Sequence, residues 1–195
     1  MPDAVKNKVE FGLRNCHYAV ADVDVDGKLI FGIPKPIPGA VSITLDKSGD
    51  LIRFKADDVD YYTNANNQGY EGTLTLALVP DDFKQDVLGE TKTIDGVMVE
   101  NADAQGKRFA LLFEFQGDKK ARRHCMYYCS ANRPSVASTT KDSGDPNTTD
   151  LDIIASPRPD NQLVKASTTE DVTQALYDNW FITVFEEGAQ PEPEV

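Results

Sequence analysis

The sequence predicts an all-β protein, mainly an antiparallel β-sandwich or barrel with one or two short helices. Three segments, at 40–46, 70–79 and 108–116, alternate apolar and polar side chains with a period of two. This period places successive side chains on opposite faces of a strand, as in an antiparallel sheet with one buried face. Clusters rich in Gly, Asn, Asp and Ser separate the segments, which is typical of the turns in such a sheet.

The strongest strand signal is the segment 108–116, in which Phe109, Leu111, Phe113 and Phe115 share one face. Aromatic and branched side chains suit a half-buried pleated surface. Further strands are predicted at 51–56, 59–63, 96–100, 124–131, 151–156 and 180–186.

Helical spacing is limited to two stretches. The first, at 80–89, begins with Pro80 and two acidic residues and ends at Gly89. The second is expected to begin at a capping box made by Ser167 and Glu170. The apolar residues that follow the box at helical spacing are Val172, Ala175 and Leu176.

The chain length of 195 residues suits one domain. We expect residues 1–185 to form that domain, with an N-terminal arm and extended loops. The segment 186–195 is rich in Pro and Glu and is expected to be a flexible tail.

The acidic stretch at 22–27, "DVDVDG", has two interpretations. Asp22, Asp24 and Asp26 match the first half of an EF-hand calcium loop, but the position that needs a bidentate carboxylate holds Ile33. The flanking segments alternate like strands, so a two-residue Asp-Gly hairpin is the favoured interpretation.

Composition excludes several classes of protein. A net charge of -12 argues against a protein that grips nucleic acid, because phosphate binding needs an excess of Lys and Arg. No apolar run approaches the roughly 20 residues of a membrane-spanning helix. The N-terminus has no apolar core of a signal peptide, so the chain is expected to stay in the cytoplasm. Three cysteines are an odd number for a disulfide framework and are expected to be reduced.

Neither a metal site nor an enzyme active site is expected. Within a strand, Cys125 and Cys129 share a face but lie about 13 Å apart, too far for two thiolates to bind one zinc ion. His17 and His124 each adjoin a cysteine in sequence, but neighbouring strand residues point to opposite faces. No nucleophile, phosphate-binding or metalloprotease motif is present, and no cofactor is implied.

Two polar segments are candidates for subunit contacts. The basic run at 117–124 joins two strands, so Lys119, Lys120, Arg122 and Arg123 are expected at a hairpin tip. The tip is either a solvated turn or a contact with the acidic surface of another copy of the chain.

The second candidate segment is 59–72, where Tyr61 and Tyr62 lie among Asn and Gly residues in a polar, aromatic-rich stretch. This composition is common at interfaces, although the tyrosines could equally pack beneath the loop.

Several segments together resemble the major tail protein of long-tailed, non-contractile bacteriophages (siphophages) of Gram-positive hosts. The resemblance runs from about residue 6 to residue 185 and leaves the acidic stretch and the last residues unmatched. Its most distinctive parts are "KNKVEFGLRNCHYA" (6–19), "GIPKPIPGAVSITLD" (32–46), "NNQGYEGTLTLALVPDDF" (66–83), "RFALLFEFQGDKKARRHCMYYCSANRPSVASTTK" (108–141) and "LVKAST" (163–168).

The resemblance implies a tail tube protein with a phage-tail-tube-like β-fold, no catalytic residues and no cofactor. Its copies would form hexameric rings, stacked into a hollow tube that carries genome DNA to the host. Expected partners are other copies of the chain and other tail proteins (tape measure, tail completion or terminator, and distal tail), with no membrane. Assembly would occur in the host cytoplasm, and the protein would end in the virion tail.

The residues add two expectations to the resemblance. An acidic chain suits a conduit, because a negative lumen would repel DNA phosphates. Leu112, opposite the phenylalanine stripe, suits a sheet whose second face is buried on assembly. The three aspartates of the acidic stretch are then candidates for lumen charge or for the partner of the basic tip.

Two rival interpretations remain open at this stage. One is a β-sandwich that binds a ligand or carbohydrate through Trp180 and the tyrosines. The other is a structural domain stabilised by calcium at the acidic stretch.

Overall fold

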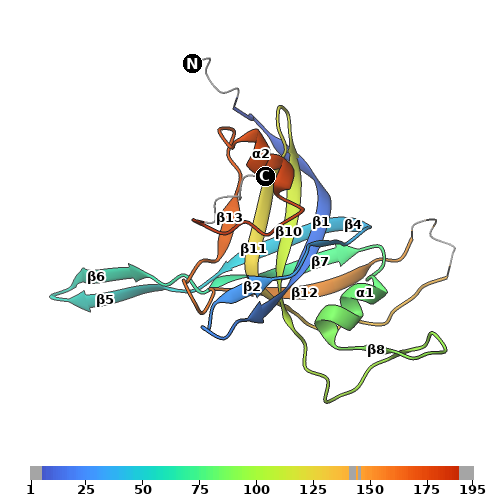
Figure 1. Cartoon of the computed structure of the whole chain (residues 1–195). Coiled ribbons are helices and arrows are strands. Elements are labelled where there is room, and N and C mark those ends of the chain that lie inside the picture. Colours follow the sequence, from blue (N-terminus) through green and yellow to red (C-terminus); the bar gives the residue numbers. More distant parts are fainter. Residues whose placement is uncertain (1–5, 141–143, 145, 189–195) are drawn as a thin grey trace.

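The computed structural model describes residues 6–140, 144 and 146–188 of the chain (Figure 1). Strands dominate and only short helical segments join them, which confirms the predicted all-β class. The strands are β1 (Glu10–Val23), β2 (Leu29–Phe31), β3 (Lys35–Pro36), β4 (Ala40–Ser48), β5 (Leu51–Ala56), β6 (Val59–Ala65), β7 (Gly69–Leu76), β8 (Thr91–Lys92), β9 (Met98–Val99), β10 (Arg108–Gly117), β11 (Arg122–Ala131), β12 (Thr149–Ser156) and β13 (Lys165–Ser167). The helical segments are α1 (Asp81–Phe83), the π-helical turn η1 (Lys84–Leu88) and α2 (Gln174–Asn179).

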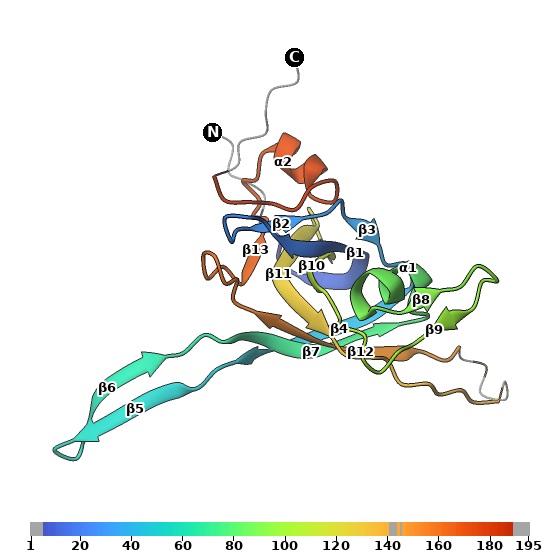
Figure 2. The same cartoon turned by 60° about the horizontal axis from the view of Figure 1, so that its bottom comes forward.

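One nine-stranded antiparallel sheet makes up the body. Its strands follow the order β2-β1-β10-β11-β12-β7-β4, with β13 paired to β11 and β3 paired to β1. The sheet bends over on itself, so that β1, β10 and β11 form one layer and β12, β7 and β4 form the other (Figure 2). The remaining strands form two separate hairpins, β5–β6 and β8–β9.

The main hydrophobic core fills the space between the two layers. The predicted stripe of β10 points into it, with Phe109 and Leu111 fully buried. From the other layer, alternate residues of β7 and β12 such as Leu74 and Leu151 meet this stripe. Phe83 at the end of α1 packs edge-on against Phe109, with ring centroids 5.4 Å apart, so the predicted helix at 80–89 closes one side of the core.

A second hydrophobic cluster covers the outer face of β1, β10 and β11. The segment that follows α2 lies across this face and buries Trp180 and Val184 against Leu112 and Tyr127. The expectation that Leu112 would be covered only on assembly is therefore wrong, because the chain's own C-terminal segment covers it. The predicted strand at 180–186 is also wrong, since these residues form turns and irregular backbone.

The expected capping box at Ser167 is a further correction. Ser167 lies at the end of β13, and helix α2 begins only after Thr173, whose hydroxyl accepts the backbone N–H of Leu176 at 3.4 Å. Glu170 instead accepts a hydrogen bond from the backbone N–H of Asn7, at 3.5 Å. The carboxylate is thus used in a tertiary contact, and the helix takes its cap from the next suitable hydroxyl.

Strand β11 changes face along its length. Its register against β10 shifts between the pairs Phe109–Cys129 and Leu111–Met126, which leaves one extra residue in β11. As a result Cys125 belongs to the outer cluster and Cys129 to the inner core, whereas an unbroken strand would place both on one face. All three cysteines are free and buried.

Among the described residues, no three His, Cys, Asp or Glu side chains come together in a way that could hold a metal ion. In the same part of the chain, no helix combines the length and apolar character needed to cross a membrane. Residues 1–5 of the expected N-terminal arm and 189–195 of the expected tail lie outside the described residues.

Candidate assembly surfaces

The outward face of strands β4, β7 and β12 is a polar wall, called here the acidic wall. The register aligns Ser42 with Thr75 and Asp150 in one row and Thr44 with Thr73 and Asp152 in the next. A third row contains Asp46, Glu71 and Ile154. Because side chains alternate along each strand, the residues between these rows point into the core.

The acidic wall carries four carboxylates, on Asp46, Glu71, Asp150 and Asp152, and its three rows contain no Lys or Arg. Cross-strand hydrogen bonds order part of it: the Thr75 hydroxyl donates to Asp150 at 2.7 Å and the Thr73 hydroxyl donates to Asp152 at 3.3 Å. The wall is therefore a rigid hydrophilic surface of one charge sign, with bound hydroxyl groups between the carboxylates.

The β5–β6 hairpin is an arm that projects from the end of the β4–β7 pair, away from the body (Figures 1 and 2). Its strands pair only with each other, and nearly all of its side chains are exposed. An isolated two-stranded hairpin is marginally stable in water. The arm therefore gains stability if another surface packs against it.

The two faces of the arm differ in character. Register places Ile52, Phe54, Val59 and Tyr62 on one face, together with their cross-strand neighbours Asn64 and Ala56. These four large side chains are 49–59% exposed. An exposed apolar stripe of this kind marks a surface that another protein covers.

A tight acidic turn ends the arm. Asp57 and Asp58 both adopt positive φ angles, 52° and 60°, as the two central residues of a type I′ hairpin turn require. Asp60 follows two positions after Asp58, and its partner in the register is Lys55. Tyr61 lies at the irregularity of β6 and is 72% exposed.

The basic run forms the tip between β10 and β11, as predicted, but its cations have different environments. The Arg123 guanidinium donates to Glu114 at 3.0 Å and lies over the ring of Tyr177, 3.6 Å from its centroid. Arg122 pairs with Glu10 at 3.2 Å and with Glu170 at 3.5 Å. Both arginines are therefore engaged within the chain.

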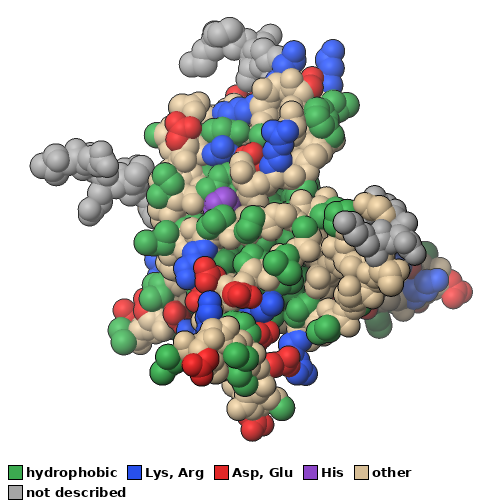
Figure 3. Space-filling view, turned by 90° about the vertical axis from the view of Figure 1, so that its right-hand side faces the viewer, with side chains coloured by type: hydrophobic (Ala, Val, Ile, Leu, Met, Phe, Trp, Pro, Cys, Tyr) green, Lys and Arg blue, Asp and Glu red, His purple; other side chains and the backbone are tan. Residues whose placement is uncertain are grey.

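The lysines of the tip remain at the surface. Lys119 is exposed, and Lys120 is half-buried with its ammonium 4.3 Å from the centroid of the Tyr177 ring. Figure 3 shows Lys and Arg side chains gathered at the end of the molecule where the tip and the N-terminal segment lie.

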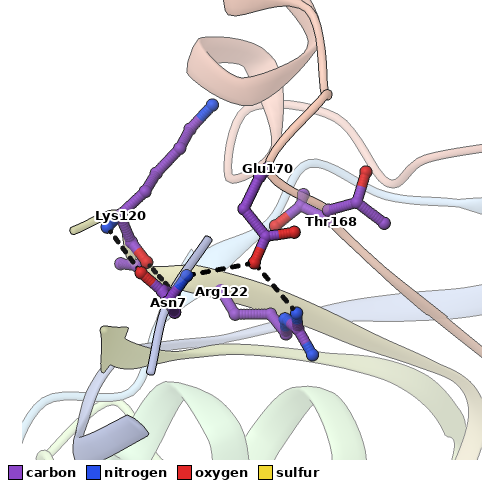
Figure 4. A pocket seen from close by; sticks show the side chains of 7 residues that line it. Asn7, Lys120, Arg122, Thr168 and Glu170 are labelled. Atoms are coloured by element: carbon purple, nitrogen blue, oxygen red, sulfur yellow. Dashed lines mark hydrogen bonds and ion pairs between the residues drawn. The ribbon is translucent and has the colours of Figure 1, made fainter. Parts of the chain in front are cut away.

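Asn7 fixes the N-terminal segment against the basic tip (Figure 4). Its side-chain N–H donates to the carbonyl of Lys120 at 2.6 Å, and its side-chain oxygen accepts the backbone N–H groups of Lys119 and Lys120 at 3.1 and 3.0 Å. Next to it, the backbone N–H of Lys8 donates to Asp118 at 2.9 Å. The arrangement adds Lys6 and Lys8 to the same surface, where both are exposed.

The acidic stretch forms the hairpin between β1 and β2, with a longer turn than predicted. The turn is closed by a hydrogen bond from Asp24 N–H to the Lys28 carbonyl at 2.9 Å, and Gly27 has a φ of 81°. It is thus a three-residue turn with a glycine bulge instead of a two-residue Asp-Gly turn. The Asp24 carboxylate accepts the N–H groups of Asp26 and Lys28, at 2.9 and 2.8 Å, so it stabilises the turn.

The predicted interface residues thus lie in three separate places: the basic tip, the arm and the acidic hairpin. The structure brings none of these three together within one chain (Figures 1 and 2). Trp180 is only 3% exposed and lies in the outer cluster, so it offers no platform for a carbohydrate ring.

The chain is similar to known proteins in sequence and in fold. A family model described as phage tail tube protein matches residues 2–183. The cryo-EM structure of the anti-feeding prophage cap, the AFP tube terminating cap, has a TM-score of 0.51 and 10% identity, and covers 86% of this chain and 98% of that chain. The sheath/tube terminator of PVC, an extracellular contractile injection system, has a TM-score of 0.49 and 14% identity, and covers 83% of this chain and 99% of that chain.

At these identities the prophage cap shows a shared fold and nothing more. A search of curated protein sequences found no significant match. The family model, in contrast, spans nearly the whole length of the chain. The chain belongs to the phage tail tube protein family and is a structural, non-enzymatic component of a phage tail.

Proposed function

We propose that the chain is the repeating subunit of the tail tube of a long-tailed, non-contractile phage of a Gram-positive host. Copies form hexameric rings, and stacked rings enclose the channel through which genome DNA leaves the particle. The observation that carries this proposal is the acidic wall, which we place on the lumen.

The chemistry of the acidic wall suits contact with moving DNA. Carboxylates repel phosphates, and the wall's three rows hold no Lys or Arg that could bind them. Hydroxyl groups between the carboxylates keep the surface hydrated without adding positive charge. DNA would therefore pass without specific binding.

The arm supports the assembly part of the proposal. Its apolar stripe of Ile52, Phe54, Val59 and Tyr62 has no partner among the described residues, and we assign a second copy of the chain as that partner. The arm continues the β4–β7 pair, so it extends from an edge of the acidic wall away from the body (Figure 2), and we place the next subunit there. A contact between different surfaces of identical chains is heterologous, and such contacts build rings and filaments.

The other partners follow from the position of a tube in a tail. The stack would end on a tail-completion or terminator protein at one end and on a distal tail protein at the other. A tape measure protein would occupy the lumen before ejection. Assembly would take place in the host cytoplasm.

Cysteine labelling tests the position of the acidic wall. The three native cysteines are buried, so a Thr73→Cys variant offers one reactive thiol on the wall, and an Asp178→Cys variant offers one on α2, outside the sheet. A bulky maleimide should label both variants as monomers but only the α2 variant in tubes seen by negative-stain microscopy. Equal labelling of both variants in tubes would place the wall elsewhere, and persistent monomers at high concentration would count against the tube itself.

A further inference from the structure

We propose that the acidic turn of the arm binds the lysine surface around Asn7 on a neighbouring copy of the chain. The acidic turn consists of Asp57, Asp58 and Asp60, and the lysine surface consists of Lys6, Lys8, Lys119 and Lys120. This contact rests on the proposed function, because it names what one subunit of the tube presents to the next.

The lysine surface is built before any partner arrives. Asn7 holds the tip through three hydrogen bonds of 2.6 to 3.1 Å, and Lys8 is tied through its backbone to Asp118. Two segments more than a hundred residues apart are thereby joined, and Figure 4 shows Asn7 of one segment against Lys120 of the other. A preorganised surface of this kind loses little conformational entropy when it binds.

The nearby acidic groups do not fully neutralise these lysines: of the neighbouring carboxylates in the described chain, only Asp118 lacks an arginine partner, and it accepts the backbone N–H of Lys8. Glu10 and Glu170 are paired with Arg122, and Glu114 is paired with Arg123. None of the ion pairs among the described residues involves Lys6, Lys8, Lys119 or Lys120. In a chain with a net charge of -12, this is a local excess of positive charge.

The carboxylates of Asp57, Asp58 and Asp60 in the acidic turn are not held in ion pairs within the described part of the chain, although Lys55 is the register partner of Asp60. The type I′ geometry fixes the first two carboxylates at the end of the arm, where they are exposed. The turn therefore presents a compact negative charge at the end of the longest projection of the fold (Figure 2).

Within one chain the two surfaces cannot meet, because the arm and the basic tip lie at separate ends of the molecule (Figures 1 and 2). The acidic hairpin at 22–27 is a weaker candidate for the partner. Asp24 is occupied in its own turn, and Lys28 lies in the same loop. The arm also projects into space where another copy can receive it.

Charge complementarity of this type sets the orientation of the partners and the rate at which they meet. Both surfaces are exposed, so added salt should weaken the contact. The apolar stripe of the arm would supply most of the affinity, and the acidic turn would select where the end of the arm binds.

Charge reversal with rescue tests the contact. Two variants reverse one surface each: Asp57→Lys with Asp58→Lys on the arm, and Lys8→Glu with Lys119→Glu on the lysine surface. Each variant should raise the protein concentration needed for assembly at least tenfold. Combining all four changes should restore most of the loss. The charge-matched controls lie in and beside the β8–β9 hairpin: Asp95→Lys with Asp103→Lys, and Lys92→Glu with Lys107→Glu. All four residues are exposed and all charges of the proposed contact remain, so both controls should assemble normally.

If the combined variant does not regain assembly, the contact is wrong. It is also wrong if the lysine-surface variant is rescued by Asp22→Lys with Asp26→Lys, because the acidic hairpin would then be the partner. An unchanged thermal midpoint of the Lys8→Glu with Lys119→Glu variant would exclude misfolding of the body as the cause. For the arm, an Asp57→Asn with Asp58→Asn variant removes the charge but keeps side chains that tolerate positive φ, so it should also weaken assembly if charge is the cause. If every variant forms tubes normally, this contact is wrong, but the proposed tube function is unaffected.

A second measurement works even for brief encounters. A zero-length carbodiimide cross-linker, applied to a mixture of ¹⁵N-labelled and unlabelled protein, should join Lys119 or Lys8 to Asp57 or Asp58 of a different copy. Cross-links confined to other pairs of surfaces would refute the assignment, whether or not tubes are present.

Discussion

Arg158 connects three parts of the chain that lie far apart in the sequence. Its side chain is fully buried, which is rare for arginine, and two carboxylates surround the guanidinium. Asp160 accepts at 2.9 and 2.7 Å, and Glu186 accepts at 2.9 and 3.0 Å. Asp160 also accepts the backbone N–H of Leu29 at 3.1 Å. The network therefore ties the β12–β13 loop to β2 and to the segment that covers the outer cluster.

Replacing Arg158 with Met should reduce the free energy of unfolding by about 3 kcal/mol, because two carboxylates would lose their shared partner. Urea denaturation would measure the change. The matched control is Arg133→Met, which removes a solvent-screened ion pair with Glu100 at the surface and should cost much less stability. A loss as small as that of the control would mean that Arg158 does not hold the covering segment in place.

The same network predicts how stability depends on pH. Hydrogen bonds from Arg158 lower the pKa of Asp160 from 3.8 to about 2. A carboxylate with a lowered pKa stabilises the folded state above its unfolded value, and this contribution disappears as the pH falls from about 4 to about 2.

The thermal midpoint should therefore drop steeply over that interval, and an Asp160→Asn variant should show a shallower drop. Parallel curves for the two proteins in differential scanning calorimetry would contradict the assignment.

At the scale of elements, period-two patterns predicted the strands that have one buried and one solvated face. β12, which has one solvated face, extends two residues beyond its predicted range. β10 extends one residue beyond its range, although its second face is buried under the outer cluster. The pattern failed at 180–186, where a run of apolar and aromatic residues is compatible both with a strand and with an irregular segment packed against the sheet. These residues bury Trp180 and Val184 by tertiary contact without strand pairing, and no local signal reports such a contact.

The candidate assembly surfaces show a similar division. The basic tip and the aromatic arm were visible in the sequence as runs of charge and of tyrosine. The acidic wall was not identified, although its signal was present as polar residues at alternate positions of three strands. Placing Asp46, Glu71 and Asp152 on one surface requires the order and register of strands that are distant in sequence, and a single sequence does not provide these.

The arm should be dispensable for folding and necessary for assembly. Replacing residues 51–65 with an Asn-Gly turn would close the hairpin where Asn66 N–H already donates to the Asp50 carbonyl at 3.2 Å. Because nearly all side chains of the arm are exposed, the thermal midpoint should change by no more than about 3 °C.

Sedimentation should show loss of assembly in the same arm-deletion variant. A large drop in the midpoint would show that the arm supports the fold, and tubes of normal length would show that it is not a subunit contact.

The whole molecule separates its charge by location. Carboxylates without Lys or Arg in the same rows occupy the acidic wall, while exposed lysines lie near Asn7, beside the tip of β10 and β11. In the proposed tube, this arrangement would give the chain a wall that repels DNA and a separate patch that attracts another copy. A uniformly acidic surface would oppose assembly by repulsion between subunits.

This separation leads to a prediction for the assembled tube. Asp150→Lys with Asp152→Lys places cations on the acidic wall, and tubes of this variant should hold a short DNA duplex in the lumen at low salt. Protection of the duplex from nuclease is the measurement, because DNA bound outside would be digested. Lysines bind phosphates by releasing counterions, so raising the salt concentration should remove most of the protected DNA. The matched variant, Asp171→Lys with Asp178→Lys, adds the same charge near α2 and should protect no more DNA than the unaltered protein. Equal protection by both variants would contradict a lumen lined by β4, β7 and β12.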